Sequence, residues 1–108
     1  MRIFFTVTLR MGAFILPNLF TVCGYKVYFW SNELFEPIHV HISKGKPSPN
    51  ATKIWLTRDG GCILANPEQN TIPQKDLSQL MEFISAQFFL ICAKWKEHFI
   101  DQEISFYC

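Results

Sequence analysis

The sequence lacks the local motifs by which many small enzymes are recognised. It contains no glycine-rich phosphate loop, no Gly-x-Ser-x-Gly nucleophile motif and no two cysteines at Cys-x-x-Cys spacing. Its four cysteines, at positions 23, 62, 92 and 108, are far apart in the sequence. Such spacing fits buried thiols as well as disulfide bridges. The motifs therefore identify no reaction.

The sequence also lacks an excess of charge of either sign. Ten Lys and Arg residues oppose nine Asp and Glu residues, which gives a formal net charge of +1. This balance argues against a dedicated DNA- or RNA-wrapping protein, which should be strongly basic. Hydrophobic residues make up 49% of the chain, so it is not wholly disordered. A length of 108 residues predicts a single domain, residues 1–108.

No hydrophobic run is long enough to cross a membrane. The longest uncharged run, residues 11–25, is interrupted by glycine, proline and asparagine. Residues 3–9 follow Arg2 as in a short signal sequence, but no small-x-small cleavage site precedes Cys23. We therefore expect a cytoplasmic protein with reduced cysteines and no membrane association. Residues 1–20 are interpreted as an N-terminal extension or a first strand.

The first half of the chain has the pattern of a β-sheet. Aromatic and β-branched residues fill 25–30, residues 38–43 alternate apolar and polar side chains, and 51–57 repeats that alternation. A short fourth strand is expected at 62–65. Turn-forming residues separate these segments, so residues 24–65 are predicted to form an antiparallel meander.

The second half is predicted to be one long amphipathic helix, residues 74–99, because apolar residues recur there at steps of three and four. Residues 104–107 are a candidate edge strand. The fold class is therefore α+β, with three to four antiparallel strands packed on one long C-terminal helix. The residues expected to face the helix are Ile38, Val40, Ile42, Ile54 and Leu56.

The most specific candidate site is a pair of histidines on one strand. His39 and His41 are two residues apart, so their side chains point to the same face of the sheet. Neutral imidazoles at this spacing can hold a divalent metal if a third ligand joins them. Glu33 and Glu36 precede them and are the candidate carboxylates. The simpler interpretation is two ordinary polar residues on an exposed face, with no cofactor.

The same face combines aromatic and basic residues. Tyr28, Trp30, Lys53 and Trp55 are expected on it, and Lys44 follows the histidine strand. Such a surface is able to stack bases and contact phosphates. The near-zero net charge favours instead a solvated face in which lysine stems cover aromatic rings. Nucleic acid remains a candidate partner.

Two segments of the chain resemble a known family. Residues 25–33 read Tyr-x-x-Tyr-Phe-x-Ser-Asn-Glu, and residues 37–41 read Pro-x-His-Val-His. This pair of motifs resembles a small bacterial family named as domain of unknown function 4160. Residues 53–56 are similar to its third strand and residues 95–99 to the end of its helix. The resemblance covers roughly residues 11–99.

The resemblance implies a cytoplasmic bacterial protein whose gene neighbours look like toxin–antitoxin or regulatory modules. The chain departs from the usual family pattern at Ile38, where relatives commonly carry a second proline, and in its extended N-terminus. It also departs at residues 88–92, an apolar helix centre that tends to be acidic in relatives. The apolar centre favours a self-association surface.

Two functional hypotheses follow. The first is a protein-binding or regulatory module of toxin–antitoxin type, whose partner is another protein or a second copy of the chain. The alternative is a histidine-dependent hydrolase of nucleotides or nucleic acid, with or without a metal. In that alternative, His39 and His41 act as ligands or as an acid/base pair, while Lys44 and Lys53 bind phosphate. The sequence leaves open whether the protein is an enzyme.

Overall fold

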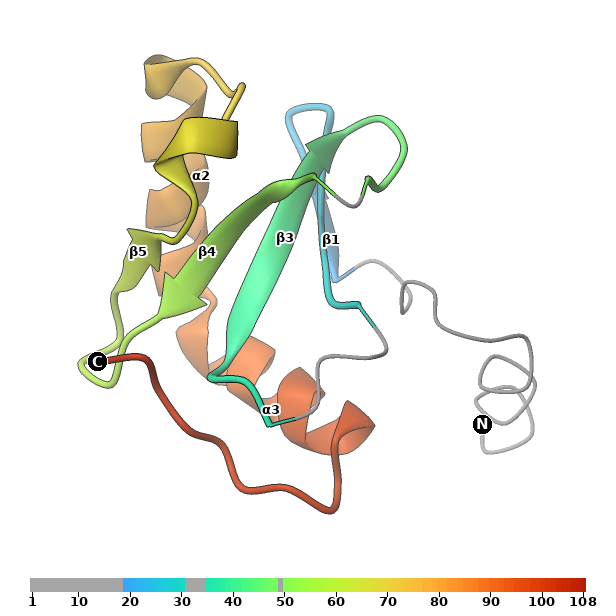
Figure 1. The fold of residues 1–108 in the computed structure, drawn as a ribbon, viewed down its shortest axis with the longest axis vertical. Coiled ribbons are helices and arrows are strands. Elements are labelled where there is room, and N and C mark those ends of the chain that lie inside the picture. The colour runs from blue at the N-terminus through green and yellow to red at the C-terminus, as the bar shows by residue number, and fades with distance from the viewer. Residues whose placement is uncertain (1–18, 31–34, 49) are drawn as a thin grey trace.

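The fold is described by a computed structural model that covers residues 19–30, 35–48 and 50–108 (Figure 1). These residues form an α+β structure, and no helix among them is long and apolar enough to cross a membrane. The strands are β1 (Phe20–Val22), β2 (Tyr25–Tyr28), β3 (His39–Lys44), β4 (Thr52–Leu56) and β5 (Cys62–Leu64). The helices are the short 3-10 helix η1 (Pro67–Gln69), α2 (Gln74–Ala86) and α3 (Phe88–His98).

The strands form one antiparallel sheet in the order β1-β2-β3-β4-β5, so the expected meander is confirmed. The expected number of three to four strands is wrong, because the sheet has five. The extra strand, β1, joins β2 through Cys23 and Gly24, whose φ angles are 51° and 83°. Positive φ at both central residues is typical of the tight turn of a two-residue hairpin. Cysteine rarely adopts that conformation, so the sequence did not indicate the turn.

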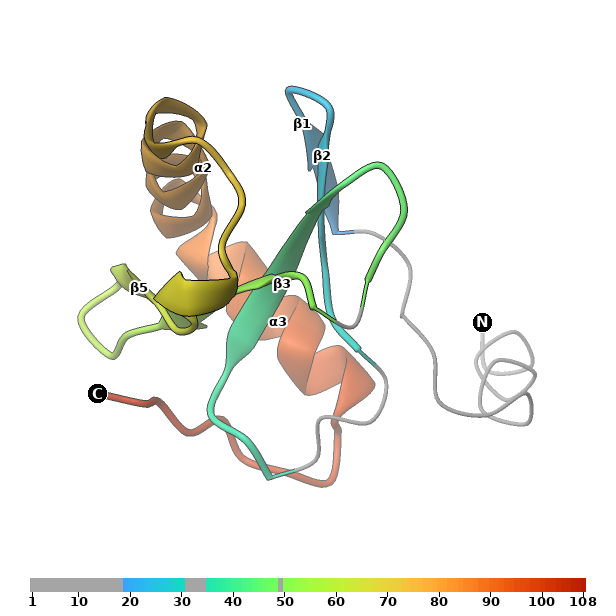
Figure 2. The ribbon, with the colours of Figure 1, turned by 45° about the horizontal axis from the view of Figure 1, so that its top comes forward.

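The single long helix predicted over residues 74–99 is wrong, because it is broken at Gln87. This residue has φ −101° and ψ 18°, and its N–H is donated to the carbonyls of Phe83 and Ile84. Neither proline nor glycine marks the break. The apolar steps of three and four continue across it, so periodicity alone could not reveal it. Figure 2 shows α2 and α3 running in different directions, with α3 crossing behind β3.

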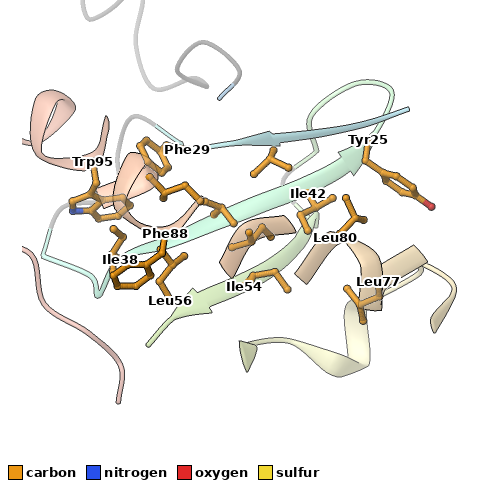
Figure 3. Packing of buried hydrophobic residues seen from close by; sticks show 14 of the residues in the cluster. Tyr25, Phe29, Ile38, Ile42, Ile54, Leu56, Leu77, Leu80, Phe88 and Trp95 are labelled. Carbon is orange, nitrogen blue, oxygen red and sulfur yellow. The ribbon is translucent and has the colours of Figure 1, made fainter. Parts of the chain in front are cut away.

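The core lies between the sheet and the inner sides of both helices (Figure 3). The five strand residues expected there are confirmed, with each side chain almost completely buried: Ile38, Val40, Ile42, Ile54 and Leu56. From the helices they meet Leu77, Leu80, Ile84, Phe88, Ile91 and Trp95. Both helices therefore bury their apolar sides against one face of the sheet.

The segment after α3, residues 100–108, has no strand assignment at 104–107. It crosses the end of the sheet and does not extend an edge (Figure 1). The Ile38 N–H donates to the Ser105 carbonyl at 2.9 Å, and the Arg58 N–H donates to the Cys108 carbonyl at 2.8 Å. These two bonds attach residues 100–108, called here the C-terminal segment, to the start of β3 and the end of β4.

Replacement of the buried Ile54 with alanine is expected to lower the free energy of unfolding by about 3 kcal/mol, because it removes core contacts and leaves a cavity. The matched control is Ile63→Ala on β5, where the side chain is exposed and the loss should stay below about 1 kcal/mol. Urea unfolding followed by circular dichroism measures both. Equal losses in the two variants would contradict the position of the core.

Candidate functional site

The candidate site lies on the sheet face opposite the core. Strand pairing aligns Tyr28 with His41 and His39 with Trp55, while Trp30 follows β2. These five side chains are called here the aromatic–histidine face. Because side chains alternate along a strand, the residues that face the helices and the residues of this face occupy alternate positions. The predicted grouping of histidines and aromatic residues on one face is therefore confirmed by the strand register.

The expectation that this face is open around the histidines is wrong. His39 is 0% exposed and His41 is 7% exposed. The His39 ring lies 5.4 Å from the ring of Trp55 and 5.4 Å from that of Trp95, while His41 stacks on Tyr28 at 5.7 Å. Large aromatic rings thus cover both imidazoles. Little of either imidazole is therefore exposed to solvent.

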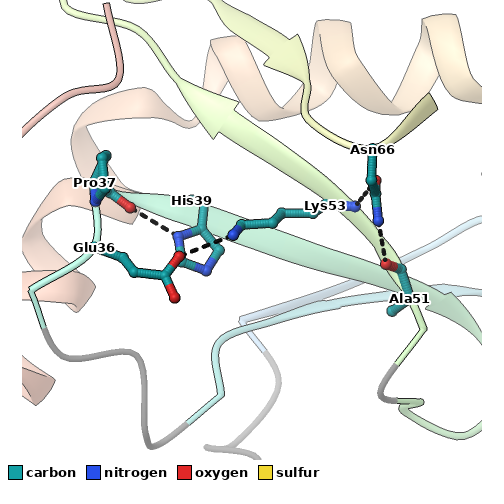
Figure 4. Close-up of polar contacts among 6 residues, drawn as sticks. All are labelled: Glu36, Pro37, His39, Ala51, Lys53 and Asn66. Atoms are coloured by element: carbon teal, nitrogen blue, oxygen red, sulfur yellow. Dashed lines mark hydrogen bonds and ion pairs between the residues drawn. The ribbon is translucent and has the colours of Figure 1, made fainter. Parts of the chain in front are cut away.

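A hydrogen bond to the backbone determines which ring nitrogen of His39 carries the proton. Nδ1 of His39 lies 2.8 Å from the carbonyl oxygen of Pro37 (Figure 4). A carbonyl oxygen only accepts hydrogen bonds, so Nδ1 carries the proton and, in the neutral ring, Nε2 is the acceptor. The His41 ring packs edge-on against His39 at 5.0 Å. The two histidines are therefore neighbours, as their spacing predicted, but within a packed aromatic cluster.

Tyr28 is completely buried, and its hydroxyl group connects two parts of the chain. The hydroxyl oxygen lies 2.8 Å from the Ser43 hydroxyl on β3 and accepts the Ser48 N–H at 3.2 Å. A ring in this position cannot stack on a nucleic-acid base. Tyr28 therefore holds β2 to β3 and to the loop after β3.

Lys53 and Trp55 are both engaged with other residues. The Lys53 ammonium group forms an ion pair with Glu36 at 2.9 Å (Figure 4). The same group lies 4.3 Å from the centre of the Trp55 ring. Tyr107 of the C-terminal segment stacks on the same ring, with a centroid distance of 5.0 Å and an interplanar angle of 3°. Both partners of the ion pair are partly exposed, so it contributes about 1 kcal/mol or less.

Of the remaining candidate residues, one lies outside the described residues and one lies away from this group. Glu33 lies outside the described residues. Lys44 lies elsewhere, with its ammonium group 5.6 Å from the Tyr25 ring, and it lines a cavity of about 410 Å³ beside α2. In that cavity the Tyr25 hydroxyl donates to Asp76 at 2.9 Å. This hydrogen bond, with burial and the negative charge of Asp76, raises the pKa of Tyr25.

The described residues offer little for metal or nucleophilic chemistry. Among residues 19–30, 35–48 and 50–108, no group of three His, Cys, Asp or Glu side chains is arranged to hold a metal ion. The thiol of Cys62 packs beside α2, where burial raises its pKa and a hydrogen bond from Ser85 only partly opposes that rise. A protonated thiol is a poor nucleophile.

Two contacts of this face were not expected from the sequence. Trp95 belongs to α3 on the core side, yet its ring reaches His39. Its apolar spacing indicated a core residue and contained no signal for contact with a histidine. Tyr107 lies more than 50 positions from Trp55, and no local pattern links the two. Both contacts depend on how α3 and the C-terminal segment meet the end of the sheet.

Comparison with known proteins gives one match. The sequence profile of the family described as domain of unknown function (DUF4160) matches residues 24–96, which is more than half of the chain. This range contains β2 to β5, α2 and most of α3, together with the whole aromatic–histidine face. No curated protein and no solved structure matches the chain.

The buried hydroxyl of Tyr28 is expected to contribute to stability. Tyr28→Phe leaves the Ser43 hydroxyl and the Ser48 N–H without this partner, so the free energy of unfolding should fall by about 1–3 kcal/mol. Tyr107→Phe removes the same atom from an exposed residue and should change stability by less than about 0.5 kcal/mol. Thermal and urea unfolding compare the two. A Tyr28→Phe variant with the same free energy of unfolding as the wild type would refute the structural role of this hydroxyl.

Proposed function

We propose that this chain, which belongs to the DUF4160 family of domains of unknown function, is a protein-binding module. The observation that carries the proposal is an apolar surface on the outside of α3. Phe89 is 83% exposed and Leu90 is 43% exposed. Ala93, also exposed, is four residues from Phe89 and three from Leu90. These three residues are called here the outer stripe, because this spacing places them on one side of α3.

The inner side of the same helix is already occupied. Phe88, Ile91 and Trp95 are buried against the sheet. The helix therefore cannot rotate to bury the outer stripe without exposing three core residues. Covering a large exposed aromatic side chain with a partner lowers the free energy, because apolar surface is removed from water. Aromatic residues are also enriched among the residues that dominate binding at the centres of protein interfaces.

The residues around the outer stripe fit the rim of an interface. Glu82, Lys94 and Glu97 are exposed on the two helices. Charged side chains in such positions remain solvated when a partner covers the apolar centre, and they select partners of complementary charge. The charges near the stripe have both signs, so this surface fits another folded protein better than it fits a nucleic acid.

The finer proposal is a regulatory role of toxin–antitoxin type. Its support is the family resemblance, which implies gene neighbours that look like such modules. In this role the partner is the product of an adjacent gene, and binding controls the activity of one member of the pair. The alternative partner to such a gene product is a second copy of the chain.

The alternative, a histidine-dependent hydrolase, receives less support from the geometry. His39 and His41 are covered by aromatic rings, and the Nδ1 of His39 is committed to the Pro37 carbonyl. Of the two candidate carboxylates, Glu36 pairs with Lys53. A general base must reach its substrate within hydrogen-bond distance, and these packed rings leave little room for one.

Phe89→Glu is expected to weaken partner binding at least tenfold, because a carboxylate then replaces the most exposed aromatic residue of the outer stripe. Affinity capture on the wild-type chain from cells that express it with its neighbouring genes identifies the partner. Sedimentation of the purified chain detects self-association. Titration of the recovered partner then compares the variants.

The matched control is Gln79→Glu, which introduces the same charge at an exposed position of α2 that is not part of the stripe. Both variants should unfold within about 1 kcal/mol of the wild type, because both positions are exposed. Equal partner binding by wild type and Phe89→Glu would overturn the role of the outer stripe. A partner that is not encoded nearby would overturn the toxin–antitoxin form of the proposal.

The hydrolase alternative has its own measurement. Elemental analysis of untagged protein, made in parallel for wild type and His39→Ala/His41→Ala, reports any bound metal. We expect no stoichiometric metal in either protein, because both imidazoles are packed among aromatic rings. Near-stoichiometric metal in the wild type that disappears in the double variant would favour the hydrolase over the protein-binding module.

A further inference from the structure

The C-terminal segment occupies a defined surface at the end of the sheet. Ile38 and Arg58 donate their N–H groups to its backbone carbonyls, while Trp55 and Phe88 contact its aromatic rings. These four residues are called here the sheet-end surface. Ile38 immediately precedes β3, Trp55 belongs to β4, Arg58 lies in the turn after β4, and Phe88 is the first residue of α3. Figure 1 shows the segment passing from the end of α3 to the turn between β4 and β5.

The side chains of the segment alternate as in an extended strand. Ile104 and Phe106 pack against the core, whereas Ser105 and Tyr107 are exposed. The Phe106 ring stacks on Phe88 with a centroid distance of 6.0 Å, and the Arg58 guanidinium group lies 5.5 Å from its centre. Backbone hydrogen bonds combined with contacts to alternate side chains are how extended peptides bind at sheets.

The sheet-end surface lies inside the range that matches the family profile, whereas the C-terminal segment lies outside it. All four residues of the sheet-end surface lie within residues 24–96, the range that matches the family profile. The segment at 100–108 lies outside that range. The surface thus lies within the range that matches the family profile, and the peptide that covers it lies beyond that range.

We propose that the sheet-end surface is a docking site for an extended segment of a partner protein and that the C-terminal segment holds this site closed. The segment that fits has a large aliphatic residue, then any residue, then two consecutive aromatic residues, as in residues 104–107. Beside the site is a shallow hollow of about 560 Å³, lined by Arg58, Ile63 and Cys108 among others. A longer partner segment has room to continue there.

The attachment of the C-terminal segment explains how it acts as a competitor. A segment joined by a short connection faces its site at an effective concentration of about a millimolar. A free peptide at micromolar concentration therefore competes poorly with it. Loss of the ring contacts of Phe106 and Tyr107 leaves this effective concentration unchanged but weakens the affinity of the segment for the surface, which opens the surface. The inference rests on the proposed protein-binding role but concerns a surface separate from the outer stripe.

The experiment uses the full chain and a fluorescein-labelled peptide that copies residues 103–108 with Cys108→Ser. Fluorescence anisotropy measures peptide binding to the wild type, to Phe106→Ala/Tyr107→Ala and to the control Gln79→Ala. We expect the double variant to bind the peptide at least ten times more tightly than the other two. A peptide with alanine at both aromatic positions should not bind, and Trp55→Ala in the double variant should abolish binding.

Circular dichroism establishes whether the double variant is folded. If it is not, Tyr107→Ala alone replaces it, because Tyr107 lies outside the core, and a gain of about threefold is then expected. A folded variant that binds the peptide no more tightly than the wild type overturns the proposal. Dimerisation of the wild type that is absent in the double variant also overturns it, because the occupant is then the segment of a second copy.

The result is separable from the test of the proposed function. Peptide binding requires no cellular partner and does not measure the outer stripe. A negative peptide result therefore leaves the Phe89→Glu comparison intact. Failure of the outer stripe to bind a partner likewise leaves the peptide measurement valid as evidence on the sheet-end surface.

Discussion

The structure depends on the burial of one indole ring, that of Trp95. This ring packs edge-on against Phe29 at 5.0 Å and at a tilt against Phe99 at 4.5 Å, and it also lies 5.4 Å from His39. Phe29 belongs to the core, whereas His39 belongs to the opposite face of the sheet. One helical residue therefore seals the end of the sheet on both sides. Trp95 reaches this position from α3, which follows the break at Gln87 and runs in a different direction from α2 (Figure 2).

The same burial determines what the histidines are able to do. Aromatic rings exclude water from His39 and His41, and a charged imidazole in such surroundings loses much of its hydration. The Pro37 carbonyl selects one tautomer of His39 and orients its ring. These features give a rigid packed cluster joined by ring contacts and hydrogen bonds. They account for His-x-His in this sequence through packing across β3, without requiring a metal or a reaction.

The sequence predicted the sheet better than it predicted the ends of the sheet. Alternation along β2, β3 and β4 correctly separated core residues from the aromatic–histidine face, because a period of two is a local property. The break at Gln87 was hidden because the apolar spacing is the same before and after it. The sequence did not indicate the hairpin at Cys23 or the contact of Tyr107 with Trp55, for two different reasons. The first needs an unusual backbone conformation, and the second joins residues far apart in the sequence.

The two proposed surfaces are separate but adjacent, because Phe88 of the sheet-end surface contacts Phe89 of the outer stripe. The Phe88 ring stacks on Phe106 of the C-terminal segment at 6.0 Å and contacts Phe89 of the outer stripe edge-on at 5.3 Å. A partner that shifts Phe88 while covering Phe89 alters the platform on which Phe106 rests. Any coupling that results must be reciprocal, since release of the segment then changes the affinity of the outer stripe by the same factor. The buried start of α3 is therefore the place through which binding at one surface would change the binding affinity of the other.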